Sequence, residues 1–134
     1  MKNKKIRNIK NCPIDRKPVA AWLGLALQAF SVGARQTNNI GFIKTANQLY
    51  QFISTSLWKN KTLYRSIKKV NTRTYPIGAA GLEDYALVAK GVIEYAQLKN
   101  NTTAKTFAIA LAKQAWQRFH KKDGWSLAEK PLIK

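Results

Sequence analysis

The chain has 134 residues, a length that predicts a single domain. Its 24 Lys and Arg against 6 Asp and Glu give a formal net charge of +18, and its 46% hydrophobic residues exclude a fully disordered chain. A single cysteine, Cys12, excludes an internal disulfide and a multi-cysteine metal site. No apolar run reaches the roughly 18 residues that a transmembrane helix needs. We therefore expect a protein of the cytoplasm.

The N-terminal residues 1–17 predict a basic, flexible leader, and residues 18–134 predict the folded domain. The leader shows no apolar periodicity. Pro18 is suited to the first position of a helix, where its missing N–H costs nothing, and Asp15 is a candidate cap. The first helix is therefore expected over residues 18–35.

Apolar residues at helical spacing predict three more helices, over residues 41–57, 82–98 and 104–120. Residues 58–80 break this pattern and predict a loop with one short strand pair. The expected fold class is all-α, with two tandem helical hairpins joined by an irregular or short-strand connection. Thr102 or Thr103 is expected to cap the fourth helix. Aromatic residues on the apolar stripes are expected in the core: Tyr50, Trp58 and Trp116.

The two predicted hairpins repeat at a constant offset in residue number. This shift places Ala34 on Ala96 and Leu49 on Leu111 (96 − 34 = 111 − 49 = 62), and it aligns two Asn-Asn pairs. Repeat units bury their apolar faces against neighbours, and such arrays usually need about three or more units. Two units are expected to leave an apolar flank for a second copy of this chain or for a completing partner chain.

Four short stretches carry a resemblance: KPVAAWLG at residues 17–24, LYRS at 63–66, LEDYA at 82–86 and DG at 123–124. They resemble the C-terminal region of the thioredoxin-domain-containing proteins with a six-hairpin, glycosidase-like (α/α) toroid, among them spermatogenesis-associated protein 20 and its bacterial relatives. The resemblance implies that this chain is a partial (α/α)6 toroid. It also implies a truncated remnant of a carbohydrate-related protein, not catalytic on its own. If active, it would act on carbohydrates with epimerase-like or glycosidase-like chemistry.

The resemblance further implies a set of residues that face a central cavity. Trp22 opens a motif that reads Trp-Asn-Gly in the family and Trp-Leu-Gly here, so the alkyl side chain of Leu23 stands where the family has an amide. The implied substrate-binding residues are Trp22, Arg65, Glu83 and Tyr85.

Asp84 is the candidate catalytic residue, because Tyr85 and Trp22 are expected to wall one cavity beside it. Adjacent helical residues point about 100° apart, so Glu83 and Asp84 are not expected to face one substrate. The alternative role for this acidic pair is to complement the dipole at a helix N-terminus. His120, at a helix C-terminus, is likewise expected to be structural. No metal-ligand spacing or phosphate loop occurs, so we expect no metal and no cofactor.

The charge pattern supports a different function. Ten Lys or Arg and no acidic residue lie between Asp15 and Glu83, and six of the ten fall in residues 59–73. Such a surface binds polyanions by releasing counterions. The alternative interpretation is a small basic protein that binds nucleic acid or another polyanion. The leader lacks an apolar face and predicts no membrane binding.

Overall fold

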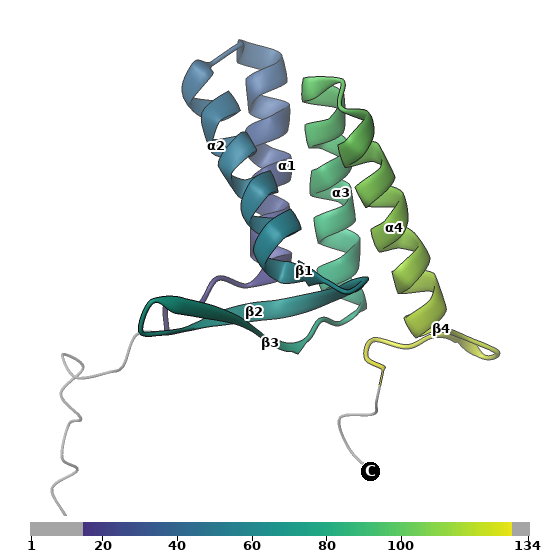
Figure 1. The fold of residues 1–134 in the computed structure, drawn as a ribbon. Helices are drawn as coiled ribbons and strands as arrows, with labels where there is room; N and C mark the ends of the chain where they lie inside the picture. Colours follow the sequence, from purple (N-terminus) through teal and green to yellow (C-terminus); the bar gives the residue numbers. More distant parts are fainter. Residues whose placement is uncertain (1–14, 130–134) are drawn as a thin grey trace, which may run out of the picture.

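Two helical hairpins stand side by side across a β-hairpin, as Figure 1 shows. The structure is a computed structural model that describes residues 15–129. The helix that begins at Ile40 continues beyond Phe52 as a π-helical segment, η2 (Ile53–Leu57). The predicted helices are all present, with ends within two residues of the predicted ones. The hairpins consist of α1 (Ala20–Thr37) with α2 (Ile40–Phe52) and of α3 (Leu82–Lys99) with α4 (Thr102–Phe119).

Strands follow each helical hairpin, and they overturn the predicted fold class. The prediction of an all-α fold is wrong, because two antiparallel sheets make the fold mixed α/β. A three-stranded sheet has the order β1-β2-β3, and a two-stranded sheet pairs β4 with β5. The strands are β1 (Trp58–Lys59), β2 (Thr62–Val70), β3 (Arg73–Ala79), β4 (His120–Lys121) and β5 (Gly124–Trp125).

The connection over residues 58–80 is a long hairpin rather than a loop with a short strand pair. β2 has nine residues and β3 has seven. Only Leu63 and Ser66 of β2 are buried, three positions apart, and no residue of β3 is fully buried. The strands therefore lack the strict apolar alternation that marks a half-buried strand in a sequence. Backbone pairing holds this hairpin together, from Tyr64 opposite Ala79 to Val70 opposite Arg73.

The elements of the first repeat recur in the second at the offset that the sequence predicts. α1 and α3 are both 18 residues long, and their first residues, Ala20 and Leu82, differ by that offset (82 − 20 = 62). α2 with η2 is related to α4 in the same way (102 − 40 = 119 − 57 = 62). The pairing of Trp58 with Leu63 in β1 and β2 recurs as His120 with Trp125 in β4 and β5. The predicted repeat therefore extends from the helices to the strands that follow them.

Both helical turns are built by an Asn-Asn pair. Asn38 and Asn100 end their helices in the left-handed conformation, with φ of 54° and 46°. The following residue caps the next helix, and the side chain of Asn101 accepts a hydrogen bond from the backbone N–H of Ala104 at 3.0 Å. Neither Thr102 nor its neighbour is the cap, because α4 already begins at Thr102 and leaves the capping position to the residue before it.

α1 begins two residues later than predicted. The backbone of Val19 is extended and forms a bridge to Ser66, whose hydroxyl donates to the carbonyl oxygen of Pro18 at 2.7 Å. This bridge holds Pro18 outside the helix. Asp15 pairs with Lys17 and makes no capping bond to α1. Residues 1–14 of the predicted leader, with Cys12, lie outside the described residues.

The backbones of α1 and α3 touch where the two helices cross. A Cβ atom built on Gly24 would lie 2.6 Å from the carbonyl oxygen of Leu87, and one built on Gly91 would lie 2.4 Å from the carbonyl oxygen of Gly24. Because real Cβ atoms do not approach backbone so closely, this crossing requires glycine at both positions. The pair forms the centre of the molecule and joins the two repeats.

The core lies between the two hairpins and above the sheet. Trp116, predicted in the core, is 56% exposed. Leu111, Ala115 and Phe119 occupy the buried face of α4, and Trp116 projects from a neighbouring face. Tyr50 and Trp58 are partly buried against the core. Within the described range, no helix is long and apolar enough to cross a membrane. The largest buried side chains include Tyr85, Phe119, Leu27, Ile53, Leu57, Leu63 and Leu111.

Candidate functional site

A pocket of about 560 Å³ lies where β2 and β3 meet the N-terminal end of α3. The segment that follows β5 closes its other side, because the N–H of Leu82 donates to the carbonyl oxygen of Leu127 at 3.0 Å. The site therefore joins residues from the middle and the end of the chain. Its wall consists of Arg65, Ala79, Ala80, Gly81, Glu83, Leu127, Ala128 and Glu129.

Asp84 lies behind this wall, 3% exposed. One carboxylate oxygen accepts from the N–H of Gly81 at 2.8 Å and from Nε of Arg65 at 3.2 Å, and the other accepts from the N–H of Ala21 at 3.2 Å. The side chain thus caps its own helix and the first turn of α1. Its place in the first turn of α3 agrees with the alternative that the sequence left open, an acidic pair that complements the helix dipole, and the capping bonds are a feature that the sequence did not show.

Arg65 is the basic residue among the side chains that line the pocket. Its side chain is 59% exposed although its Nε is bonded to Asp84. A guanidinium has five N–H groups, and among residues 15–129 its terminal nitrogens have no hydrogen-bond acceptor. One of them lies over Gly81, where an added Cβ would come within 3.2 Å. Asp84 therefore orients Arg65 so that four N–H donors are available to a ligand.

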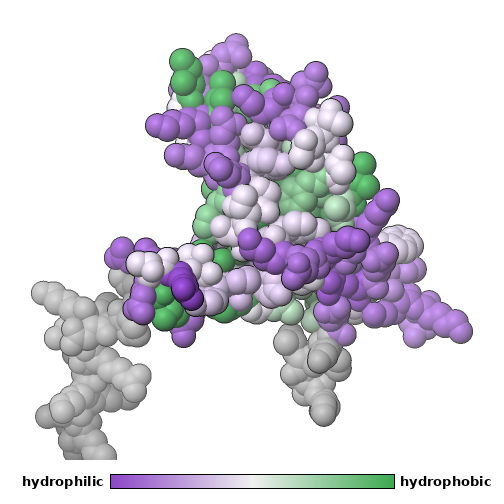
Figure 2. Space-filling view, in the orientation of Figure 1, coloured by the Kyte–Doolittle hydropathy of each residue, from purple (hydrophilic) through white to green (hydrophobic). Residues whose placement is uncertain are grey.

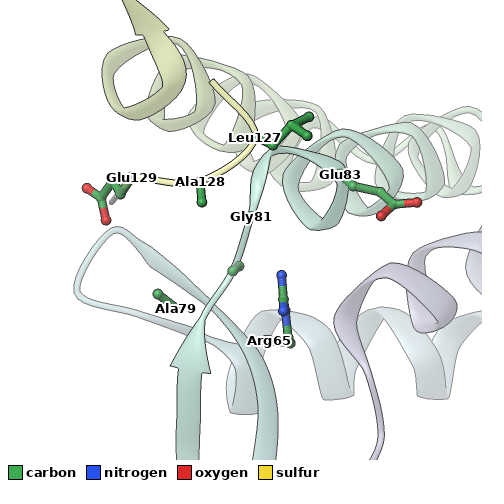
Figure 3. Close-up of a pocket in the computed structure, with 8 residues that line it drawn as sticks. Arg65, Ala79, Gly81, Glu83, Leu127, Ala128 and Glu129 are labelled. Carbon is green, nitrogen blue, oxygen red and sulfur yellow. The ribbon is translucent and has the colours of Figure 1, made fainter. Parts of the chain in front are cut away.

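Two acidic side chains complete the polar part of the pocket. Glu83 is exposed in the first turn of α3, and Glu129 pairs with Arg118 at 3.0 Å. Figure 3 shows Arg65 between the strands and α3, with Glu83 and Glu129 on opposite sides of it. The combination of donors and acceptors on an otherwise apolar wall suits a small hydroxylated or anionic ligand.

Tyr85 lies in the core rather than on the pocket wall. Its hydroxyl oxygen accepts a hydrogen bond from the N–H of Leu63 at 2.9 Å, and its ring packs edge-on against Phe119. Burial raises the pKa of Tyr85 above its ordinary value. The side chain therefore anchors β2 to α3.

Trp22 is 73% exposed on α1 and does not line the pocket. The structure thus brings together Arg65, Glu83 and Asp84 of the predicted site residues and places Trp22 and Tyr85 elsewhere. Sequence reasoning missed Glu129, because nothing in the local pattern shows that the segment after β5 returns to α3.

The described part of the chain offers few side chains for metal binding or for histidine-based catalysis. No group of three or more His, Cys, Asp or Glu side chains lies close enough to hold a metal ion within residues 15–129. His120 stacks on Trp116 at 4.1 Å between ring centroids and lies 5.2 Å from Trp125. It is therefore part of an aromatic cluster and not of the pocket.

Comparison with known proteins identifies a similar fold. No family model matches the sequence, and no curated protein matches it. The chain is similar to the crystal structure of a sugar epimerase from a ruminal bacterium, with a TM-score of 0.73 and 13% sequence identity. The match covers 84% of this chain and 30% of the epimerase chain. The protein therefore shares the fold of about a third of an (α/α)-toroid-like enzyme.

Proposed function

We propose that this chain is a sector of a carbohydrate-related (α/α) toroid of the thioredoxin-domain-containing type and that its Arg65 pocket binds a sugar. The fold shared with a sugar epimerase carries this proposal. The polar wall of the pocket supports it, because Arg65 donates hydrogen bonds and Glu83 accepts them, which matches the paired donors and acceptors of neighbouring sugar hydroxyls.

The chain by itself is proposed to be a remnant without catalysis. Asp84, the candidate acid or base, is buried and already accepts hydrogen bonds from three donors. A general base must reach the proton that it abstracts. The carboxylate of Asp84 reaches two backbone N–H groups and Arg65 instead, so its task is to hold the pocket together.

Sugar binding can be tested by following backbone amide NMR shifts during titration with a panel of sugars and N-acyl sugars. We expect the shifts to concentrate at residues 79–83 and 127–129. The affinity obtained from the titration should be at least fivefold weaker in Glu83→Gln. Asp123→Asn is the matched control, because it neutralises an exposed carboxylate outside the pocket. Shifts that are missing at the pocket, or equal in both variants, would refute the proposal.

Catalysis is tested with the same panel. We expect no turnover by the wild-type protein. Turnover that disappears in Asp84→Asn would show that the chain is an enzyme on its own and would overturn this part of the proposal.

The exposed basic face of the strands favours a second candidate, a polyanion. Lys68, Lys69 and Arg73 are exposed on β2 and β3, and none of them forms an ion pair with another residue of the described range. Figure 2 shows hydrophilic side chains at the end of the β2–β3 hairpin, at the lower left, interspersed with paler and hydrophobic ones. Closely spaced cations of this kind attract phosphates along a nucleic-acid backbone.

A DNA or RNA titration at about 50 mM and 200 mM salt distinguishes this candidate, because counterion release makes the affinity fall steeply with salt. Exchange of Lys68, Lys69 and Arg73 for Gln should weaken binding at least tenfold. The control exchanges three exposed cations elsewhere, and equal losses in both variants would show that only overall charge matters. The control positions are Lys99, Lys105 and Lys113.

A further inference from the structure

The repeat leaves two open faces that correspond to the two sides of its internal interface. Inside the molecule, α1 presents Ala21 and Gly24 to α3, and α3 presents Asp84 and Gly91 to α1. The equivalent of the first set, one repeat further along the chain, lies on the free side of α3. The equivalent of the second set, one repeat earlier, lies on the free side of α1. We call these surfaces the α3 flank and the α1 flank.

The α1 flank is exposed and apolar. Asp84 and Gly91 of the internal interface correspond to Trp22 and Ala29 (84 − 62 = 22; 91 − 62 = 29), and the backbone contact at Leu87 corresponds to Leu25. Trp22 is 73% and Leu25 46% exposed, and Ala29 is exposed as well. Trp22 and Leu25 lie one helical turn apart on the same side of α1, and contiguous apolar patches of this kind mark interaction sites.

The α3 flank has a matching character. Gly24 of the internal interface and the buried Ser31, two helical turns further along α1, correspond to Ala86 and Ile93 (24 + 62 = 86; 31 + 62 = 93). Ala86 is exposed and Ile93 is 44% exposed. On α4, Ile109 is 54% exposed, and its equivalent Asn47 accepts the cross-repeat hydrogen bond from Tyr95. The α3 flank is therefore apolar at the equivalents of Gly24 and Ser31, whereas the equivalent of Ala21 is the exposed Glu83.

An apolar groove beside the α1 flank extends this correspondence. It has a volume of about 530 Å³, and Leu23 and Leu49 contribute to its wall. Their equivalents, Tyr85 and Leu111, are buried, and Tyr85 is bonded to Leu63 of β2. Leu63 in turn corresponds to Trp125, which is 53% exposed at the opposite end of the molecule. Leu23 in the groove thus has no strand residue in the place that Leu63 takes beside Tyr85, and Trp125 is the repeat equivalent of that strand residue.

Taken together, these correspondences lead us to propose that copies of this chain associate head to tail, with the α3 flank and Trp125 of one copy on the α1 flank and groove of the next. The contact uses the same helix faces as the internal α1–α3 interface but holds the helices further apart, because Ala86 and Ala29 stand where the close internal crossing requires two glycines. On the helix faces themselves, Glu83 and Lys90 offset each other on α3, and Trp22, Leu25 and Ala29 of the α1 flank are uncharged. The cations of this contact lie at its edge, with Arg16 at the groove and Lys121 and Lys122 close to Trp125 in the chain. A heterologous contact of this kind forms a ring or a chain of copies.

The proposal is tested by the mass of the intact chain in sedimentation equilibrium over a range of concentrations. We expect multiples of 15.1 kDa for the wild-type protein. Trp22→Asp and Ile93→Asp should each reduce the mass to that of one chain. Val70→Asp is the matched control, because Val70 is also 44% exposed but lies at the end of β2, and it should leave the mass unchanged. Should Trp22→Asp not fold, Leu25→Asp tests the same flank.

A mixture of the two variants tests the head-to-tail geometry directly. The Trp22→Asp copy keeps an intact α3 flank and the Ile93→Asp copy keeps an intact α1 flank, so the mixture should form a dimer with one copy of each. A wild-type protein that stays at 15.1 kDa at all concentrations would overturn the proposal. So would a mixture without dimers, or dimers of either variant alone. The test involves no sugar, so its outcome is independent of the carbohydrate proposal.

Discussion

The first repeat, from α1 to β2, and the second, from α3 to β5, place the same elements at the same spacing but surround equivalent side chains differently. Gly91 meets the backbone of α1, whereas its equivalent Ala29 faces outward. Asp84 is buried with three hydrogen bonds, whereas its equivalent Trp22 is 73% exposed. The comparison shows that the helical frame is set locally, while the role of each side chain depends on which neighbour lies against it.

The largest effect is expected where the two repeats touch. Gly91→Leu should lower the free energy of unfolding by about 3 kcal/mol or more, because its side chain would enter the backbone of α1. Ala29→Leu creates the same residue at the equivalent open position and should change stability by less than about 0.5 kcal/mol. Urea unfolding at low protein concentration measures both. Equal losses would contradict the assignment of an internal and an open face.

The second effect concerns the cap that joins the repeats. Asp84→Asn should lower the free energy of unfolding by about 2–3 kcal/mol, because the amide group would turn a donor toward donors of Arg65, Gly81 or Ala21. Asp123→Asn, on an exposed residue, should change it by less than about 0.5 kcal/mol. A loss for Asp84→Asn as small as that of the control would show that the cap contributes nothing.

The third effect concerns Tyr85, which is buried, whereas its repeat equivalent Leu23 lines an open groove. Tyr85→Phe should cost about 1–2 kcal/mol at neutral pH, because the buried N–H of Leu63 would lose its acceptor. Tyr64→Phe is the control, since among the described residues its hydroxyl makes no hydrogen bond. Denaturant melts in which the two variants behave alike would contradict this role.

Tyr85 also predicts a pH dependence. Its pKa is raised by burial in the folded state, so above pH ~10 the unfolded chain ionises first and the folded chain stays protonated. The stability that this tyrosine contributes is present below pH ~10 and is lost as the pH rises through its folded pKa. The free energy of unfolding should fall less steeply above pH ~10 in Tyr85→Phe. Burial raises the pKa of Tyr50 and Tyr95 as well, so part of the slope should remain.

The smallest effect tests whether the two helical turns are equivalent. Asn38→Ala and Asn100→Ala should each lower the free energy of unfolding by about 1 kcal/mol, because alanine disfavours the left-handed conformation at these positions. Glycine at either position should restore or exceed the original stability. Losses that differ by more than about 1 kcal/mol between the two turns would show that they are not equivalent.

Part of the candidate site was accessible from the sequence, through the resemblance carried by LYRS and LEDYA. Those stretches led to Arg65, Glu83 and Asp84, which the structure brings together. They could not show that Asp84 is buried under Ala21, because these two residues lie far apart in the chain. They also could not show that Glu129 closes the pocket, since a return of the chain to α3 leaves no local pattern.

The sequence by itself determined the four helices, the two Asn-Asn turns and the repeat of the hairpins, because helical periodicity and capping depend on residues within one or two turns. Only the tertiary structure decided that residues 58–80 form long paired strands and that Trp116 lies outside the core. Strand pairing and burial depend on groups far apart in the chain, such as Tyr64 opposite Ala79 or Phe119 against Tyr85. For the same reason, only the folded chain shows that Gly24 and Gly91 are in contact, whereas their repeat equivalents Ala86 and Ala29 are exposed in a single chain.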